Sequence, residues 1–191
     1  MNKNFEFLNK VGNLSEGSFK KLQGLAIYRK ILSNQVLSES GIVPKKVYML
    51  VSGVITAFVN SESGKQFNKQ IFTPISFAGA LTAILKNEPS EVTYMTLTEC
   101  KVYEIDFEDF KELCRQDFEI GRLYVKVLEH IFITYEARSL DLMRLDATER
   151  YVKLRSQIPD IDNLIPQYQI ASYLNITPVQ LSRIRKKINF I

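Results

Sequence analysis

The pattern of apolar and polar positions divides the chain into three parts. From about residue 27 to residue 105, turn residues separate short apolar or alternating runs, which predicts β-strands. From Asp117 to about Met143 there is no proline and apolar side chains recur at helical spacing, which predicts one long helix. From Asp146 onward the pattern predicts shorter helices, the last of them basic. We therefore expect domains at residues 1–116, 117–145 and 146–191.

The first part has the sequence pattern of an all-β domain. Runs of strand-forming residues occupy positions 35–38, 46–51, 54–59, 67–72 and 101–105. The segment from Asn60 to Lys65, between two of these runs, is typical of a hairpin turn. Short helices are expected near residues 15–22 and 107–114. Many short strands at this spacing favour a sandwich, a barrel or a jelly roll.

The long helix is apolar nearly all round in its first half, which is hard to explain in a monomer. We expect one face to pack on the strand domain and another on a second copy of the chain. A helix buried within one domain is the alternative. Asp146 followed by Glu149 is typical of a new helix start, so we expect a hinge near Leu145. The side chains expected in the dimer contact are Ile120, Tyr124, Val127 and Ile131.

The third part predicts a helix-turn-helix. One helix is expected to end near Leu174, and a turn follows through Asn175 and Ile176. Thr177 and Pro178 then form a strong helix start, because the threonine hydroxyl caps free amides and proline fits the first turn. The second helix, residues 177–187, occupies the place of a recognition helix.

The polar face of residues 177–187 suits the DNA major groove. Helical spacing places Leu181, Ile184 and Ile188 on one side and the polar face opposite. Arginine bonds guanine, valine contacts a thymine methyl, and lysine or serine holds phosphate. The alternative is that this polar face is only solvated. Gln180 can also complete a capping box with Thr177 instead of contacting DNA. The expected DNA contacts are Thr177, Val179, Gln180, Ser182, Arg183 and Lys186.

The distribution of charge supports this interpretation. Residues 144–191 hold eight Lys or Arg and four Asp or Glu, whereas residues 1–143 hold seventeen of each. The net charge of +4 therefore comes from the last quarter. A cationic domain beside a neutral one is typical of a chain in which one part meets a polyanion. A membrane is disfavoured, because the basic helix lacks a broad apolar face.

Few residues are available for metal or redox chemistry. Cys100 and Cys114 are the only cysteines and His130 is the only histidine. This set fits neither a disulfide framework, a zinc finger nor an iron–sulfur cluster. A haem with a single protein ligand is disfavoured, because His130 lies in an amphipathic helix. No Gly-rich phosphate loop or nucleophile elbow occurs, so we expect no metal, no cofactor and no enzymatic activity. The absence of a signal peptide or transmembrane pattern predicts a cytoplasmic protein.

The order of these parts resembles the catabolite-activator and fumarate-nitrate-regulator (Crp/Fnr) superfamily of bacterial transcription factors. The resemblance rests on Val47 to Gly53, Phe77 to Gly79, and Ile170 to Ile184. It implies an α+β fold with a cyclic-nucleotide-binding-like jelly roll, a dimerisation helix and a C-terminal helix-turn-helix. The C-terminal helix-turn-helix domain is similar to the shorter type, without a β-wing, found in regulators of the Bacteroidetes group. Arg183 matches the family's base-reading arginine, whereas Pro178 and Val179 replace its charged base readers.

The resemblance fails at the expected effector pocket. It implies a glutamate after Gly79 for the ribose and an Arg-Ser or Arg-Thr pair about ten residues on for the cyclic phosphate. This chain instead has Ala80, Ser90 and Glu91 at those positions. A phosphate facing Glu91 is repelled where it needs a cation. We therefore expect that cyclic AMP is not the effector, while another small molecule remains open.

The leading hypothesis is a homodimeric transcriptional regulator that reads a palindromic DNA operator. The resemblance also implies RNA polymerase as a partner. The alternative is a small-molecule or protein-binding module whose C-terminal domain does not bind DNA. Binding to DNA at low salt discriminates between the two, because neutralisation of phosphates gives even nonspecific affinity.

Overall fold

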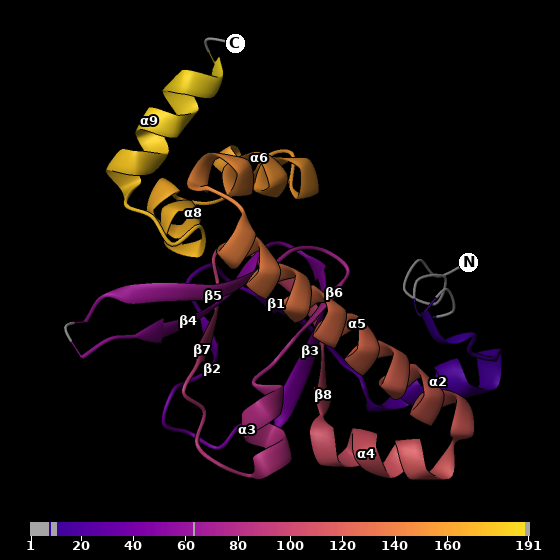
Figure 1. Ribbon diagram of the computed structural model, residues 1–191. Helices are drawn as coiled ribbons and strands as arrows, with labels where there is room; N and C mark the ends of the chain where they lie inside the picture. The colour runs from indigo at the N-terminus through magenta and orange to yellow at the C-terminus, as the bar shows by residue number, and fades with distance from the viewer. Residues whose placement is uncertain (1–7, 9–10, 63, 190–191) are drawn as a thin grey trace.

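The computed structural model describes residue 8, residues 11–62 and residues 64–189. Within these residues, eight strands form two antiparallel four-stranded sheets (Figure 1). The first sheet has the order β1-β8-β3-β6 and the second the order β2-β7-β4-β5. The strands are β1 (Ile27–Ile31), β2 (Val36–Ser38), β3 (Lys46–Ser52), β4 (Ile55–Asn60), β5 (Gln66–Phe72), β6 (Ser76–Ala78), β7 (Thr93–Thr96) and β8 (Cys100–Asp106).

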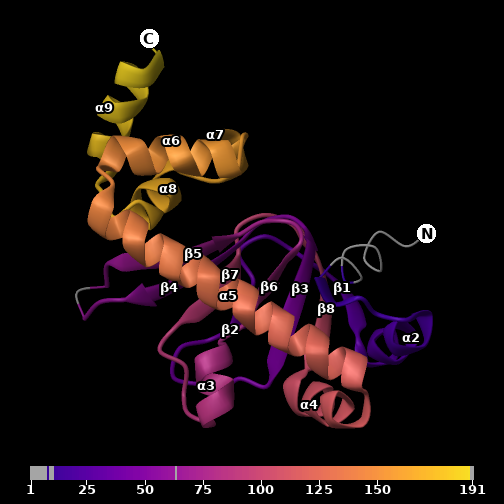
Figure 2. The same ribbon diagram turned by 45° about the vertical axis from the view of Figure 1, so that its right-hand side comes forward.

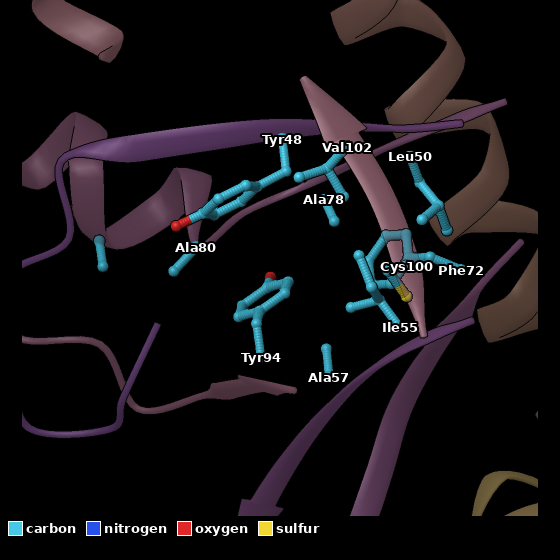
Figure 3. Close-up of a cluster of buried hydrophobic side chains, with 11 residues drawn as sticks. Tyr48, Leu50, Ile55, Ala57, Phe72, Ala78, Ala80, Tyr94, Cys100 and Val102 are labelled. Carbon is cyan, nitrogen blue, oxygen red and sulfur yellow. The ribbon is translucent and has the colours of Figure 1, made fainter. Parts of the chain in front are cut away.

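The two sheets enclose an apolar core. Side chains alternate between the two faces of a strand, and along β3 this sends Tyr48 and Leu50 into the core. Met49, between them, joins a second cluster on the outer face of the same sheet. Ile55 and Tyr94 enter the core from the second sheet (Figure 3). The strand domain is therefore a two-layer β structure with apolar side chains on both faces of the first sheet.

Helices cover that outer face. They are α2 (Glu16–Leu25), α4 (Phe107–Gln116) and α5 (Phe118–Arg144), while the short α3 (Leu81–Lys86) lies between β6 and β7 (Figures 1 and 2). Asp117 caps α5 and also accepts hydrogen bonds from Ser18 Oγ at 3.0 Å and Lys21 Nζ at 2.7 Å. The hydrogen bond from Lys21 is the largest cause that lowers the pKa of the Asp117 carboxyl. This buried carboxylate joins α2 to the start of α5.

The C-terminal part is helical. It contains α6 (Ala147–Gln157), α7 (Ile161–Leu164), α8 (Gln167–Tyr173) and α9 (Pro178–Asn189), with no strand between α6 and α8. Asp146 and Glu149 form the predicted capping box of α6, and Leu145 is the last residue bonded to α5. The predicted break between the long helix and the C-terminal helices therefore coincides with a change of helix.

Candidate functional site

The turn between α8 and α9 is built by local hydrogen bonds. Asn175 has a positive φ of 56°, a conformation that asparagine tolerates better than most residues. The backbone N–H of Ile176 then donates to the carbonyl of Ala171 at 3.0 Å. Ala171 is fully buried, and its small side chain allows α8 and α9 to approach. The predicted helix, tight turn and second helix are therefore present.

A capping box starts α9. The backbone N–H of Gln180 donates to Thr177 Oγ1 at 3.2 Å, and the backbone N–H of Thr177 donates to Gln180 Oε1 at 2.8 Å. The Thr177 hydroxyl also donates to the same amide oxygen at 3.1 Å. The acceptor atom of Gln180 is thus occupied within its own helix, which leaves its Nε2 group as the part that can face a ligand.

The two faces of α9 differ as the sequence predicts. Leu181 is fully buried, and Ile184 and Ile188 pack against the same cluster. Val179 is 60% exposed. The other predicted contacts on α9, and Thr177 before it, are also exposed; on the helix they are Gln180, Ser182, Arg183 and Lys186. The structure therefore gathers all six predicted DNA contacts at one exposed surface, which we call the α9 face.

The cations of α9 divide into two groups. Arg185 is half-buried and lies 3.6 Å from Asp162, whose other oxygen accepts a hydrogen bond from Tyr151 at 2.6 Å. Burial, followed by the hydrogen bond to Asp162, raises the pKa of Tyr151 to about 12. Arg183 and Lys186 form no ion pair with any carboxylate in the described ranges. Arg185 is therefore structural, and the other two cations are available to an anion.

The residues predicted for the dimer contact pack largely within their own chain. Ile120 is fully buried in the cluster on the outer face of the first sheet. Tyr124 packs against Phe107 and Phe110, with ring centroids 6.0 and 5.6 Å apart. Val127 and Ile131 are half-buried and line cavities beside the strand domain. The helix turns this apolar face to its own sheet.

Another side of α5 exposes apolar side chains that the sequence pattern did not single out. Phe132 is 66% exposed and Met143 is 78% exposed. Helical spacing places these side chains on one side of the helix. We call this set the α5 apolar stripe, and its members are Val125, Phe132, Ile133, Leu140 and Met143. The stripe is a row of apolar side chains that α5 leaves exposed in a single chain.

The predicted effector residues surround one large cavity. Gly79, Ala80, Ser90 and Glu91 all line a space of about 900 Å³ between the strand domain and α5. Ser90 is buried, and its hydroxyl donates to the carbonyl of Val92 at 2.8 Å, so this side chain is occupied in the loop. The cavity also reaches α6 and α8, where its walls include Leu154, Gln157, Ile158 and Tyr173.

The charges in this cavity differ from those that a cyclic phosphate needs. Lys69 lines the cavity with its Nζ 5.1 Å from the centre of the Tyr135 ring. Burial lowers the pKa of Lys69, and the negative charge of Glu91 partly opposes this shift. Neither Ala80 nor Ser90 carries a charge, and Glu91 brings a negative one. The cavity therefore has mixed charge and no arginine at the predicted phosphate position.

The described residues contain no group of three or more side chains suited to hold a metal ion. Cys100 is buried, with its Sγ 3.5 Å from the carbonyl oxygen of Val54. Burial raises the pKa of the thiols of Cys100 and Cys114. Among the helices of the described ranges, none is long and apolar enough to cross a membrane.

The sequence of residues 28–117 matches the family model of the cyclic nucleotide-binding domain. Among curated proteins, no sequence matches the chain. The family match covers the two sheets and α4, together with all four predicted effector positions.

Solved structures of bacterial regulators have the same fold over most of their length. The c-di-GMP-responsive global regulator CLP of Xanthomonas campestris is 16% identical, with a TM-score of 0.71 over 92% of each chain. FixK2 of Bradyrhizobium japonicum is 16% identical, with a TM-score of 0.70 over 86% of this chain and 85% of FixK2. A transcriptional regulator of the Crp/Fnr family from Eubacterium rectale is 12% identical, with a TM-score of 0.71 over 93% and 85%. The Crp/Fnr resemblance predicted from the sequence is thus confirmed for the fold.

Proposed function

We propose that the chain is a transcriptional regulator of the Crp/Fnr type that binds DNA through the α9 face. The observation that carries this proposal is the exposure of Arg183 and Lys186 on the second helix of a helix-turn-helix, where neither pairs with a carboxylate of the residues that the structure describes. Such a helix enters the major groove with its first turns at the base edges. Arg183 is the proposed base reader, and Lys186 and Ser182 are the proposed phosphate contacts. Val179 is positioned to contact a thymine methyl.

We further propose that the regulator acts as a homodimer on a two-fold symmetric operator. The α5 apolar stripe supports this, because a monomer in water gains nothing from a row of exposed Phe, Ile and Leu side chains. Pairing of two α5 helices along the stripe buries it and produces two α9 faces related by a two-fold axis. Symmetric half-sites about one helical turn apart match such a dimer. RNA polymerase is the proposed partner once the operator is bound.

We propose that the large cavity binds an effector other than cyclic AMP. The mixed charge of the lining supports this, because Glu91 faces the place where a cyclic phosphate needs an arginine. Calorimetry with cyclic AMP and the purified chain tests it directly. We expect no saturable heat at micromolar ligand, and saturable binding in that range would refute the proposal.

The decisive experiment for DNA binding is selection of duplexes from a random pool by the purified full chain at near-physiological salt. We expect enrichment of an inverted repeat. The matched control is Arg183→Ala, which removes the proposed base reader and leaves the buried core untouched. Indifference of the wild-type chain to any duplex at low salt would support the alternative, in which the C-terminal domain binds protein.

A further inference from the structure

A second cavity lies on the outer face of the first sheet, away from the core between the sheets. Its volume is about 130 Å³, and its walls come from β3, β6 and β8 and from α2, α4 and α5. Along β3, Met49 points to this side and Leu50 enters the core, while Tyr48 and Ala78 of the core cluster also line the cavity. It adjoins the large cavity near the edge strand β6 and along α5. The residues that line both cavities are Phe77, Gly79, Leu81, Val127, Leu128 and Ile131.

The lining of this outer cavity is apolar. None of the described residues that line it carries a charge. Leu22, Met49 and Leu123, from three different elements, are each less than a tenth exposed. Phe110 and Tyr124 form one wall, with their rings packed edge to face at 5.6 Å. Water is poorly held in such a space, because an ordered water needs two to four polar partners.

The volume matches a defined class of ligand. Protein interiors are close-packed, and voids larger than a water molecule are few. A cavity of about 150 Å³ lined by Leu, Ile and Phe side chains stays dry and takes up benzene. A charged molecule would lose its hydration here without gaining a compensating partner. Met49 adds a flexible, polarizable side chain that adapts to the shape of an aromatic guest.

We propose that the outer cavity is a binding site for a small uncharged apolar molecule, of the size of one aromatic ring or a short aliphatic chain. The ligand fills the space between the sheet and α5, where Leu123 and Val127 reach into it. Because α5 continues unbroken to Arg144 and the next helix begins at Ala147, a ligand in the cavity contacts the helix that leads directly into the C-terminal domain. Binding at this site does not depend on the proposed DNA-binding function.

The test is thermal unfolding of the full-length chain with toluene as the probe. Binding to the folded state raises the unfolding midpoint Tm by mass action. We expect Tm to rise and to saturate with toluene concentration. Ala26→Leu extends a side chain into the outer cavity, so its Tm should not respond to toluene. Thr82→Leu is the matched control, because Thr82 lines only the large cavity, and its Tm should respond as the wild type does.

Methyl NMR of the wild-type chain gives an independent readout that needs no variant. Toluene should shift the methyl signals of Met49 and Leu123 and leave that of Ala57, in the core between the sheets, unchanged. No change in Tm or in these methyl signals overturns the proposal, because the cavity is then closed or filled by the protein itself. A Tm response that persists in Ala26→Leu also overturns it, since toluene then binds elsewhere.

Discussion

Ser172 and Asn68 join the helix-turn-helix to the strand domain: the hydroxyl of Ser172 accepts a hydrogen bond from the backbone N–H of Asn68 at 2.9 Å. The same hydroxyl donates to the carbonyl of Gln66 at 3.0 Å. β5 lies at the edge of its sheet, so these backbone groups have no strand partner on that side. One side chain of α8 thus takes the place of a neighbouring strand. Asn68 Nδ2 adds a hydrogen bond to Gln169 Oε1 at 2.6 Å.

Replacing Ser172 by alanine should reduce stability. The change leaves the N–H of Asn68 and the carbonyl of Gln66 without their partner at a part-buried contact. We expect the free energy of unfolding to fall by about 1–3 kcal/mol, the usual cost of an unsatisfied buried polar group. Urea unfolding measures it. Ser182→Ala, on the exposed α9 face, should unfold as the wild type does. Equal stability of both variants would mean that the contact between α8 and β5 contributes nothing.

Two arginines two positions apart should affect different properties: Arg183 the affinity for DNA, and Arg185 the stability of the fold. Arg183→Ala removes an exposed cation, so we expect the affinity for the selected operator to fall by about 1–3 kcal/mol, with relaxed selectivity at one base pair. Its unfolding midpoint should not change. Arg185→Ala removes one of the two arginines paired with Asp162, the other being Arg155, and should lower the unfolding midpoint. Fluorescence anisotropy with the operator and thermal unfolding give the two values. If Arg183→Ala bound the operator normally, the α9 face would be assigned wrongly.

Acid should weaken the junction of α2 and α5. The hydrogen bond from Lys21, with a smaller contribution from Ser18, keeps the pKa of Asp117 below its ordinary value of 3.8, although burial partly opposes this shift. A carboxyl whose pKa is lower in the folded state stabilises the fold at pH values above its ordinary pKa. This contribution is lost as the pH falls through the pKa of the folded state. Lys21→Met should make stability less dependent on pH below about pH 5. Lys20→Met, at a neighbouring exposed position, should keep the wild-type profile. Identical profiles for all three chains would contradict this role for Lys21.

Local signals in the sequence predicted the helix boundaries well. Each cap joins two residues three positions apart, Asp146 with Glu149 and Thr177 with Gln180, and both capping boxes are present. The strands 46–51 and 67–72 agree with β3 and β5 to within a residue at each end. These features depend on neighbouring residues, which a single sequence displays.

Features that depend on distant residues were not predicted. β6 has only three residues, too few for a periodic pattern, and it exists because Ala78 pairs with Tyr48 of β3. Periodicity showed that α5 is apolar on more than one side, yet it did not say which side packs on the sheet. Phe107 and Phe110 decide this by contacting Tyr124. Likewise, nothing near Arg185 in sequence reveals its ion pair with Asp162.

The dimer prediction now rests on the α5 apolar stripe rather than on Ile120. Phe132→Glu places a charge in the middle of the stripe, where dimer formation would have to bury it at a large cost. We expect the chain to sediment as a monomer and to lose operator affinity, because one copy reaches only one half-site. Leu142→Glu, an exposed position on another side of α5, should sediment as the wild type does. A dimeric Phe132→Glu chain would place the contact between copies away from the stripe, and with it the spacing of the two α9 faces.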